Sequence, residues 1–309
     1  MSMPEVDRHS TTYPFIEPGR FTGTLQGQVA LITGAGRGIG KAIALAFARA
    51  GANVICVART EREIDDVVAQ ISKRGYPKAI AVCADISNDQ ELCRLIGTAA
   101  EVFPSIDILV NNAGVDRIGS LEHETSFSAW WRVFEVNMKG PAALTHHVLP
   151  GMISRGCGTI IHIGSRNAIH NHPFMTAYSA SKTALLRFHQ CLHLELQGSN
   201  VHTFYMQPGD VKTTLMDNSV NEDEILKVPG LQAMVAGMHD TMGEDQSDAP
   251  DLAADTCVAL AADPDARALS GLYLDATKDL GQILAHIKEE NGSIIKKRRL
   301  YTLKVDQLR

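Results

Sequence analysis

The sequence contains few cysteines, and none of them is spaced as a Cys-x-x-Cys pair. Such spacing would indicate a thiol metal site or a redox motif, so neither is expected. Most of the cysteines lie in apolar stretches, which favours reduced core residues of a cytoplasmic protein over a disulfide framework. The chain of 309 residues has six: Cys56, Cys83, Cys93, Cys157, Cys191 and Cys257.

Long apolar runs and an excess of basic residues are also missing. No run reaches the roughly 18 residues of a transmembrane helix, and residues 1–20 lack the apolar region of a signal peptide. The formal net charge is −6, and the one basic run is Lys296–Arg299. We therefore expect no membrane span and no nucleic-acid or anionic-membrane partner.

The rest of the chain alternates between short apolar stretches and amphipathic stretches. Near-continuous apolar strands that alternate with helices indicate a parallel sheet covered on both faces. The sequence predicts strands at 28–33, 53–58, 78–84, 106–110, 158–165, 200–207 and 271–275. It predicts helices at 39–50, 61–73, 88–102, 127–136, 141–155, 176–197 and 250–262. The predicted fold class is α/β, a Rossmann-type doubly wound parallel sheet in a single domain.

A glycine-rich turn joins the first strand to the first helix. It reads T-G-x-x-x-G-x-G from Thr33 to Gly40. Bare backbone at such a turn can approach a pyrophosphate, which the helix N-terminus also attracts. The alternative is a merely tight strand–helix turn. The strand–turn–helix context favours the phosphate-binding interpretation.

Tyr178 and Lys182 are four residues apart in a predicted helix, so they share one of its faces. A phenol has a pKa of about 10, and a nearby ammonium favours the phenolate. Lowering that pKa to about 7 takes roughly 4 kcal/mol, which one close cation can supply. The pattern predicts an activated tyrosine. A surface pair without function is the alternative.

Together these motifs resemble the short-chain dehydrogenase/reductase family from Leu25 to Asp275. TGAGRGIG resembles its cofactor loop, and Ser165 stands thirteen residues before Tyr178, the usual interval. The other matches are Asp85, Asn111-Asn112-Ala113-Gly114, Asn137 and the segment Pro208–Thr213. Several independent motifs in order make chance agreement implausible.

The resemblance implies a catalytic set of Asn137, Ser165, Tyr178 and Lys182. Ser165 would hydrogen-bond the substrate oxygen, and Tyr178 would act as general acid or base. Lys182 would hold the nicotinamide ribose, and Asn137 would anchor a water of the proton relay. The implied cofactor-binding residues are Gly34, Gly36, Arg37, Gly38, Ile39, Gly40, Arg59, Asp85, Ile86, Asn111, Asn112, Ala113, Gly114, Tyr178, Lys182, Pro208, Gly209, Val211 and Thr213.

The residues of the second predicted strand and just after it indicate which nicotinamide cofactor is bound. An NAD site places an acid about 20 residues beyond the glycine-rich turn, but Asn53–Ala58 contains none, and Arg59 follows at once. Arg59 and Arg37 can bind a 2′-phosphate, which predicts NADP(H). The alternative is that both arginines face solvent, and Glu61 and Glu63 could compete for Arg59.

The histidines are a further set of candidate functional groups. His189 and His193 are four residues apart, but no third ligand is evident, so no metal site is expected. His170 and His172, near Ser165, are either loop residues or part of a substrate pocket. A serine hydrolase is excluded because no G-x-S-x-G motif is present.

The predicted organisation is an N-terminal arm (1–24), the main domain (25–275) and a C-terminal extension (276–309). Within the domain, residues 215–250 are either a mobile lid or an ordinary core helix. Its apolar side chains at helical spacing would suit a bulky apolar substrate; they are Leu231, Met234, Val235, Met238 and Met242. The two extensions resemble those of fungal family members, some tied to secondary metabolism.

The expected function is therefore an NADP(H)-dependent oxidoreductase acting on a carbonyl or secondary alcohol. A ketone reductase for a bulky apolar substrate, such as a secondary metabolite, is the favoured form. The alternatives are an NAD-dependent alcohol dehydrogenase, a scaffold recruited to cyclisation or isomerisation, and a non-catalytic nucleotide-sensing protein. We expect a small-molecule partner and a homodimer or homotetramer.

Overall fold

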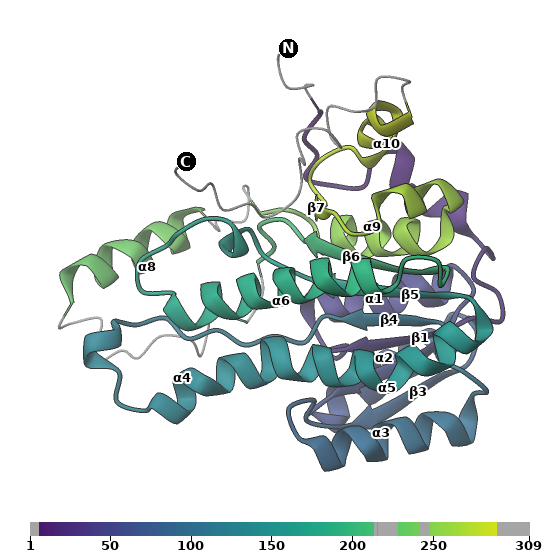
Figure 1. The fold of residues 1–309 in the computed structure, drawn as a ribbon, viewed down its shortest axis with the longest axis horizontal. Coiled ribbons are helices and arrows are strands. Elements are labelled where there is room, and N and C mark those ends of the chain that lie inside the picture. Colours follow the sequence, from purple (N-terminus) through teal and green to yellow (C-terminus); the bar gives the residue numbers. More distant parts are fainter. Residues whose placement is uncertain (1–5, 213–214, 216–227, 242–246, 289–309) are drawn as a thin grey trace.

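The structure is a computed structural model, which describes residues 6–212, 215, 228–241 and 247–288. The described strands form one seven-stranded parallel sheet in the order β3-β2-β1-β4-β5-β6-β7 (Figure 1). They are β1 (Val29–Thr33), β2 (Asn53–Ala58), β3 (Ala79–Cys83), β4 (Ile108–Asn111), β5 (Gly158–Ile163), β6 (Val201–Gln207) and β7 (Tyr273–Asp275). Strand order reverses between β1 and β4, and a sheet of this kind binds ligands beyond the carboxyl ends of its strands at that point.

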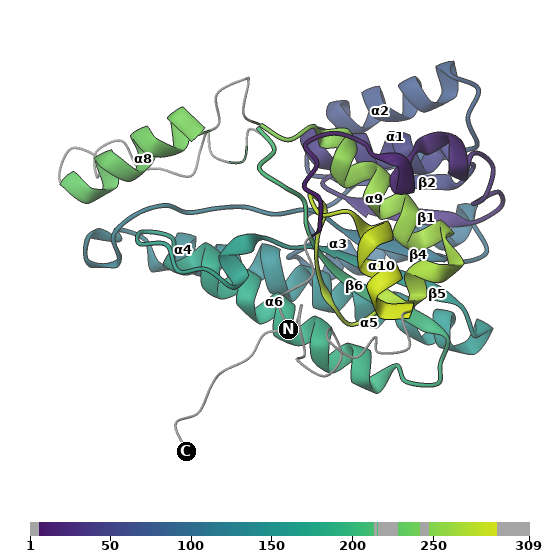
Figure 2. The ribbon, with the colours of Figure 1, turned by 90° about the horizontal axis from the view of Figure 1, so that it is seen from above.

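Helices cover both faces of the sheet (Figures 1 and 2). Alternate residues of β1 enter different cores: Ala30 and Ile32 pack with α1, α2 and α9, whereas Val29 and Leu31 pack with α3, α5 and α6. The described helices are α1 (Gly38–Arg49), α2 (Glu61–Lys73), α3 (Asp89–Val102), α4 (Phe127–Phe134), α5 (Gly140–Arg155), α6 (Thr176–Glu195), α8 (Pro229–Thr241), α9 (Pro250–Ala262) and α10 (Leu280–Lys288). The predicted doubly wound Rossmann-type fold is confirmed.

The segments on either side of the predicted domain pack into its core. Tyr13 and Ile16 of the arm are buried, as are Leu280 and Ile283 of α10. The Tyr13 hydroxyl donates a hydrogen bond to the Lys278 carbonyl at 3.1 Å and accepts one from the Leu280 N–H at 3.2 Å. Both flanks therefore contribute to the hydrophobic core that also holds the sheet.

The cysteines are only partly core residues. Cys56 and Cys257 are buried, but Cys93, Cys157 and Cys191 are exposed. The expectation that they lie in the core was wrong for these three. Cys93 and Cys191 lie on outward faces of amphipathic helices, and Cys157 precedes β5. A local apolar stretch does not by itself determine which side of a helix faces solvent.

Candidate active site

Glycines of the glycine-rich turn stand where a side chain would have no room. Gly34 has φ +66°, and a Cβ there would lie 2.9 Å from Nδ2 of Asn112. A Cβ at Gly40 would collide with the Gly34 carbonyl oxygen. Helix α1 begins at Gly38, so its unpaired N–H groups lie at this turn. The bare backbone and the helix N-terminus together fit a pyrophosphate.

Hydrogen bonds attach the loop after β4 to the glycine-rich turn. The Thr33 hydroxyl accepts hydrogen bonds from the N–H groups of Asn112 and Ala113, each at 3.0 Å. The Asn112 side-chain amide donates to the Thr33 carbonyl at 2.8 Å. Thr33 and the Asn-Asn-Ala-Gly segment therefore form one unit at the carboxyl ends of β1 and β4.

A cavity of about 380 Å³ extends from this turn along the carboxyl edge of the sheet. The predicted site residues that line it are Gly34, Gly36, Arg37, Gly38, Ile39, Gly40, Arg59, Asp85, Ile86, Asn112, Ala113, Gly114, Ser165, Tyr178, Lys182, Pro208, Gly209 and Val211. Asn111 and Asn137 are buried beside the cavity without lining it. Thr213 lies outside the described residues.

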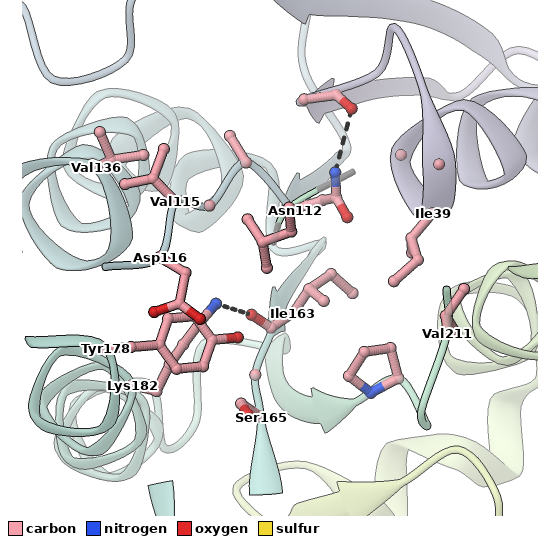
Figure 3. Close-up of a pocket in the computed structure, with 18 of the residues that line it drawn as sticks. Ile39, Asn112, Val115, Asp116, Val136, Ile163, Ser165, Tyr178, Lys182 and Val211 are labelled. Atoms are coloured by element: carbon pink, nitrogen blue, oxygen red, sulfur yellow. Dashed lines mark hydrogen bonds between the residues drawn. The ribbon is translucent and has the colours of Figure 1, made fainter. Parts of the chain in front are cut away.

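Tyr178, Lys182 and Ser165 gather on one side of this cavity (Figure 3). Tyr178 and Lys182 come from α6 and share a face, as their spacing predicts, with the Lys182 Nζ 5.7 Å from the Tyr178 ring centroid. That ammonium donates a hydrogen bond to the Ile163 carbonyl at 2.9 Å. Ser165 follows β5, and its N–H donates to the Tyr205 hydroxyl at 3.1 Å. Lys182 is thereby held by β5, and Ser165 by the neighbouring strand β6.

The pKa of Tyr178 differs from the sequence-based expectation. Burial, and then the charge of Asp116, raise the pKa of Tyr178 above its ordinary value, while a hydrogen bond from Ser165 lowers it by less. Burial also lowers the pKa of Lys182 to about 8. The expected depression of the Tyr178 pKa is therefore wrong for this structure, because burial and the Asp116 charge outweigh the Ser165 hydrogen bond.

Asp116 is the member of this group that sequence reasoning missed. It stands two residues after Gly114, lines the cavity, and lies beside Tyr178 and Lys182 in Figure 3. Burial raises the pKa of its carboxyl group to about 7, although a hydrogen bond from the Arg117 N–H and the charge of Lys182 lower it. Asp116 could have been predicted from the sequence, because it stands two residues after the Asn-Asn-Ala-Gly segment that the sequence already assigns to the cofactor site.

Asn137 has a structural position that explains its burial. It lies in a π-helical turn (Glu135–Lys139) between α4 and α5. Its side-chain oxygen accepts from the Val115 N–H, and its amide donates to the Val115 carbonyl, both at 2.9 Å. The amide also donates to the Ser181 hydroxyl at 3.1 Å. Asn137 thus joins the loop carrying Asp116 to α6.

Apolar side chains also line the cavity. Met175, Leu215 and Met234 line it together with His172. In α8, Leu231 is buried and forms a small core with Ile118 and Met175, against which Tyr178 also packs. Residues 216–227 and 242–246 of the predicted lid, including Met242, lie outside the described residues.

The other histidines considered from the sequence lie elsewhere. His170 lines a smaller neighbouring pocket. His189 and His193 approach hydroxyl groups, with Nδ1 at 3.0 Å from Thr203 Oγ1 and at 3.2 Å from Ser270 Oγ respectively. Across the described ranges, no group of three or more His, Cys, Asp or Glu could hold a metal ion. None of the helices in those ranges is both long and apolar enough to cross a membrane.

The two arginines predicted to bind a phosphate line the cavity near the glycine-rich turn. Arg37 precedes α1, and Arg59 follows β2. Glu63 lines the same region, and its side chain occupies the space that a Cβ at Gly36 would need. The Glu63 carboxylate therefore lines the same part of the cavity as Arg37 and Arg59.

Asp85 lines the cavity after β3, and its carboxylate is already engaged. Oδ1 accepts from the Ser87 N–H at 3.0 Å and hydroxyl at 2.7 Å, and Oδ2 pairs with Arg132. Burial alone would raise the pKa of Asp85, but the Ser87 hydrogen bonds and the Arg132 charge lower it overall. This carboxylate is ionised at neutral pH.

Comparison with known proteins agrees with this geometry. The family model described as short chain dehydrogenase matches residues 28–225. A short chain dehydrogenase of Pseudocercospora fijiensis is 38% identical over 95% of this chain and 94% of its own length. The short chain dehydrogenase pigC of Monascus ruber is 31% identical over 95% of this chain and 92% of its own.

Two solved structures that are similar to this chain contain a nicotinamide cofactor. A putative NAD(P)-dependent gluconate 5-dehydrogenase from Beutenbergia cavernae, with bound NADP, has TM-score 0.69 and 29% identity over 83% of this chain and 96% of its own. A 3-ketoacyl-(acyl-carrier-protein) reductase from Brucella melitensis, in complex with NADH, has TM-score 0.69 and 28% identity over 81% of this chain and 97% of its own.

The chain belongs to the short-chain dehydrogenase/reductase family. It is an oxidoreductase of the class that uses a nicotinamide cofactor. The glycine cradle and the Thr33–Asn112 unit fit the pyrophosphate of such a cofactor.

Proposed function

We propose that the protein is an NADP(H)-dependent ketone reductase acting on a bulky, apolar substrate. The observation that carries this proposal is one cavity that joins the glycine-rich turn to Ser165, Tyr178 and Lys182. A bound nicotinamide supplies or accepts the hydride. The chain itself must position the carbonyl, stabilise its oxygen and deliver a proton.

Ser165 and Tyr178 divide the work at the substrate oxygen. The Ser165 hydroxyl donates a hydrogen bond to that oxygen as negative charge develops on it. The Tyr178 O–H bond breaks as the proton moves to the same oxygen. Lys182, held by the Ile163 carbonyl, stabilises the phenolate that remains. At neutral pH the Tyr178 phenol carries the proton that ketone reduction requires.

Apolar residues of the cavity wall support the proposed substrate class. Met175, Leu215 and Met234 present flexible, polarisable surface, and α8 packs behind it. Such a wall favours a large apolar ketone over a small polar one. The preference for NADP(H) is supported by Arg37 and Arg59 beside the turn, where β2 offers no acid.

The test is turnover with a panel of ketones of increasing size, with NADPH or NADH. Oxidation of NADPH in step with formation of the alcohol, strongest for bulky apolar ketones, is the expected result. Tyr178→Phe is the matched control because it keeps the ring and removes the transferable proton. Absence of turnover across the panel, or equal turnover by the control, would contradict the proposal.

A further inference from the structure

Tyr205 of β6 is a fully buried phenol next to the site. Its ring stacks on that of Tyr273, with 5.6 Å between the ring centroids. The two rings belong to a small core to which α6 contributes Leu185 and Leu186. A phenol buried in this way needs hydrogen-bond partners for its hydroxyl group.

The partners of the Tyr205 hydroxyl lie in the two elements that carry the proposed catalytic groups. The hydroxyl accepts a hydrogen bond from the Ser165 N–H at 3.1 Å and donates one to the Lys182 carbonyl at 3.2 Å. One hydroxyl can do both, because it has a hydrogen to donate and lone pairs to accept. Ser165 follows β5, whereas Lys182 lies in α6. The Tyr205 oxygen therefore bridges the end of β5 and the helix that bears Tyr178.

The residue before Ser165 makes room for this bridge. Gly164 does not have a positive φ, so its backbone conformation does not require glycine. A Cβ at Gly164 would instead collide with the Tyr205 ring. The Gly164 N–H donates to the Met206 carbonyl at 2.7 Å, so the pairing with β6 continues past the end of β5. The bare backbone at Gly164 thus lets the ring pass and its hydroxyl reach Ser165.

A second hydrogen bond fixes the side chain of Ser165. Its Oγ accepts from the Asn167 N–H at 3.1 Å, as the N-cap of a short 3-10 helix (Arg166–Ala168). The hydroxyl hydrogen stays available for an acceptor in the cavity. With its N–H held by Tyr205 and its Oγ by Asn167, Ser165 is oriented by the protein itself. Stabilising a charge that develops on a substrate oxygen requires a donor that is already in place.

We propose that the Tyr205 hydroxyl is a positioning group that keeps Ser165 in register with the reacting face of α6. The proposal rests on the function proposed above and deepens it. In carbonyl reduction the hydroxyl groups of Ser165 and Tyr178 must reach the same substrate oxygen, although their backbones belong to separate elements. Tyr205 does not line the cavity, so it acts through Ser165 and not on the substrate.

Tyr205→Phe tests the proposal because it keeps the ring and removes the hydroxyl. We measure kcat and KM for ketone reduction, and the Kd of NADPH, in the variant and the parent protein. The value of kcat should fall about tenfold to a hundredfold, as for a small misplacement of a group that acts in the transition state. The Kd of NADPH should not change. Should this variant fail to fold, Tyr205→Met provides a second side chain without the hydroxyl, for which the same loss is expected.

Tyr273→Phe is the matched control. It removes a hydroxyl from the neighbouring ring of the same small core, and Tyr273 does not line the cavity. Its kcat should equal that of the parent protein. An unchanged kcat in Tyr205→Phe would overturn the proposal, and so would equal losses in the two phenylalanine variants.

A double-mutant cycle with Ser165→Ala separates positioning from a general effect on packing. Ser165→Ala removes the hydroxyl that Tyr205 is proposed to position and keeps the N–H. In this background Tyr205→Phe should lower kcat little further, because the group that it positions is already gone. A loss by the same factor in both backgrounds would show that Tyr205 does not act through Ser165.

A measurement without turnover separates this proposal from the proposed function. Protein labelled with ¹⁵N at serine is followed by hydrogen exchange, and the Ser165 amide signal is assigned by its loss in Ser165→Ala. In Tyr205→Phe the Ser165 amide should exchange about tenfold faster, since it has lost one hydrogen bond. The Ser179 amide, which donates to the Met175 carbonyl at 2.9 Å, should keep its rate. An unchanged rate at Ser165 would overturn the bridge, whereas failure of every ketone to react would overturn the proposed function alone.

Discussion

Asp85 and Asp116 lie on the wall of one cavity, each after a strand of the same parallel sheet, but their surroundings differ. Asp85 follows β3 and is engaged by Ser87 and Arg132, which hold its pKa below the ordinary value. Asp116 follows β4, and burial raises its pKa to about 7 despite the charge of Lys182. The difference shows that partners and desolvation, not residue type or place at the sheet edge, determine which acid can retain a proton.

The difference in pKa also suits Asp85 and Asp116 to different roles in the site. A carboxylate that stays ionised can accept hydrogen bonds from a bound ligand at any physiological pH. One that titrates near neutrality can alter the protonation of its neighbours, here Tyr178 and Lys182.

The largest effect is expected at Tyr178, which lies beside Asp116 in the cavity. Tyr178→Phe should lower kcat for ketone reduction at least a hundredfold, since general acid catalysis contributes about 10²–10⁴. Cofactor binding should change little because the ring stays. Single-turnover kinetics and cofactor titration check both parts. Near-normal reduction by the variant would show that the proton comes from elsewhere.

Asp116→Asn should change the pH dependence of stability. A carboxyl group whose pKa is raised on folding costs stability as pH rises from its unfolded pKa of about 3.9 to its folded pKa, here about 7. The cost reaches about 4 kcal/mol at most, and the amide does not incur it. The variant should therefore gain stability over the parent protein as pH rises from 5 to 8.

Urea unfolding at several pH values measures this gain in the free energy of unfolding. Glu124→Gln is the control, since burial does not raise the pKa of that acid overall. A gain that is the same at pH 5 and pH 8 would show that Asp116 does not titrate with a raised pKa.

The sequence predicted the fold because hydrophobic periodicity and local signals agree there. The strand 53–58 and the helix 61–73 have the predicted bounds. The π-helical turn (Glu135–Lys139) was missed because its residues have ordinary helical composition, and the widening depends on tertiary contacts of Asn137. Helix α10 was missed because its apolar face is defined by contact with the arm.

The site was predicted where residues occur in a fixed order along the chain, as with Ser165, Tyr178 and Lys182. Asp116 and the pKa of Tyr178 could not be predicted in this way. Both depend on how deeply the groups are buried and on which charges face them across three separate elements. Spacing within a helix gives proximity but no measure of desolvation, and here desolvation is the largest contribution.

A moderate effect is expected at Arg59, beside the glycine-rich turn. Arg59→Ala should weaken NADPH binding by about 1–3 kcal/mol, the range of charge-assisted hydrogen bonds, and leave NADH binding unchanged. Calorimetric titration of both cofactors into both proteins measures this. Glu63→Gln sharpens the test, since removing a carboxylate near the turn should strengthen NADPH binding. Equal losses for both cofactors would contradict a 2′-phosphate contact.

The smallest effect is expected at the ion pair of Asp85, whose members are one quarter and one third exposed. Arg132→Ala should lower stability at pH 7 by about 0.2–1 kcal/mol, as for other partly solvated pairs. Arg132 also contacts Ser87 and Glu135, so the Asp85 coupling is isolated by a double-mutant cycle with Asp85→Asn.

Since folding lowers the pKa of Asp85, its stabilising contribution is complete above pH values of about 4 and is lost as pH falls through the folded pKa. The coupling measured by urea unfolding should thus be constant from pH 7 to 5 and shrink below pH 4, opposite to the pH range in which Asp116 acts. A coupling that changes between pH 5 and 8 would mean that Asp85 also titrates near neutrality, and the contrast between the two acids would fail.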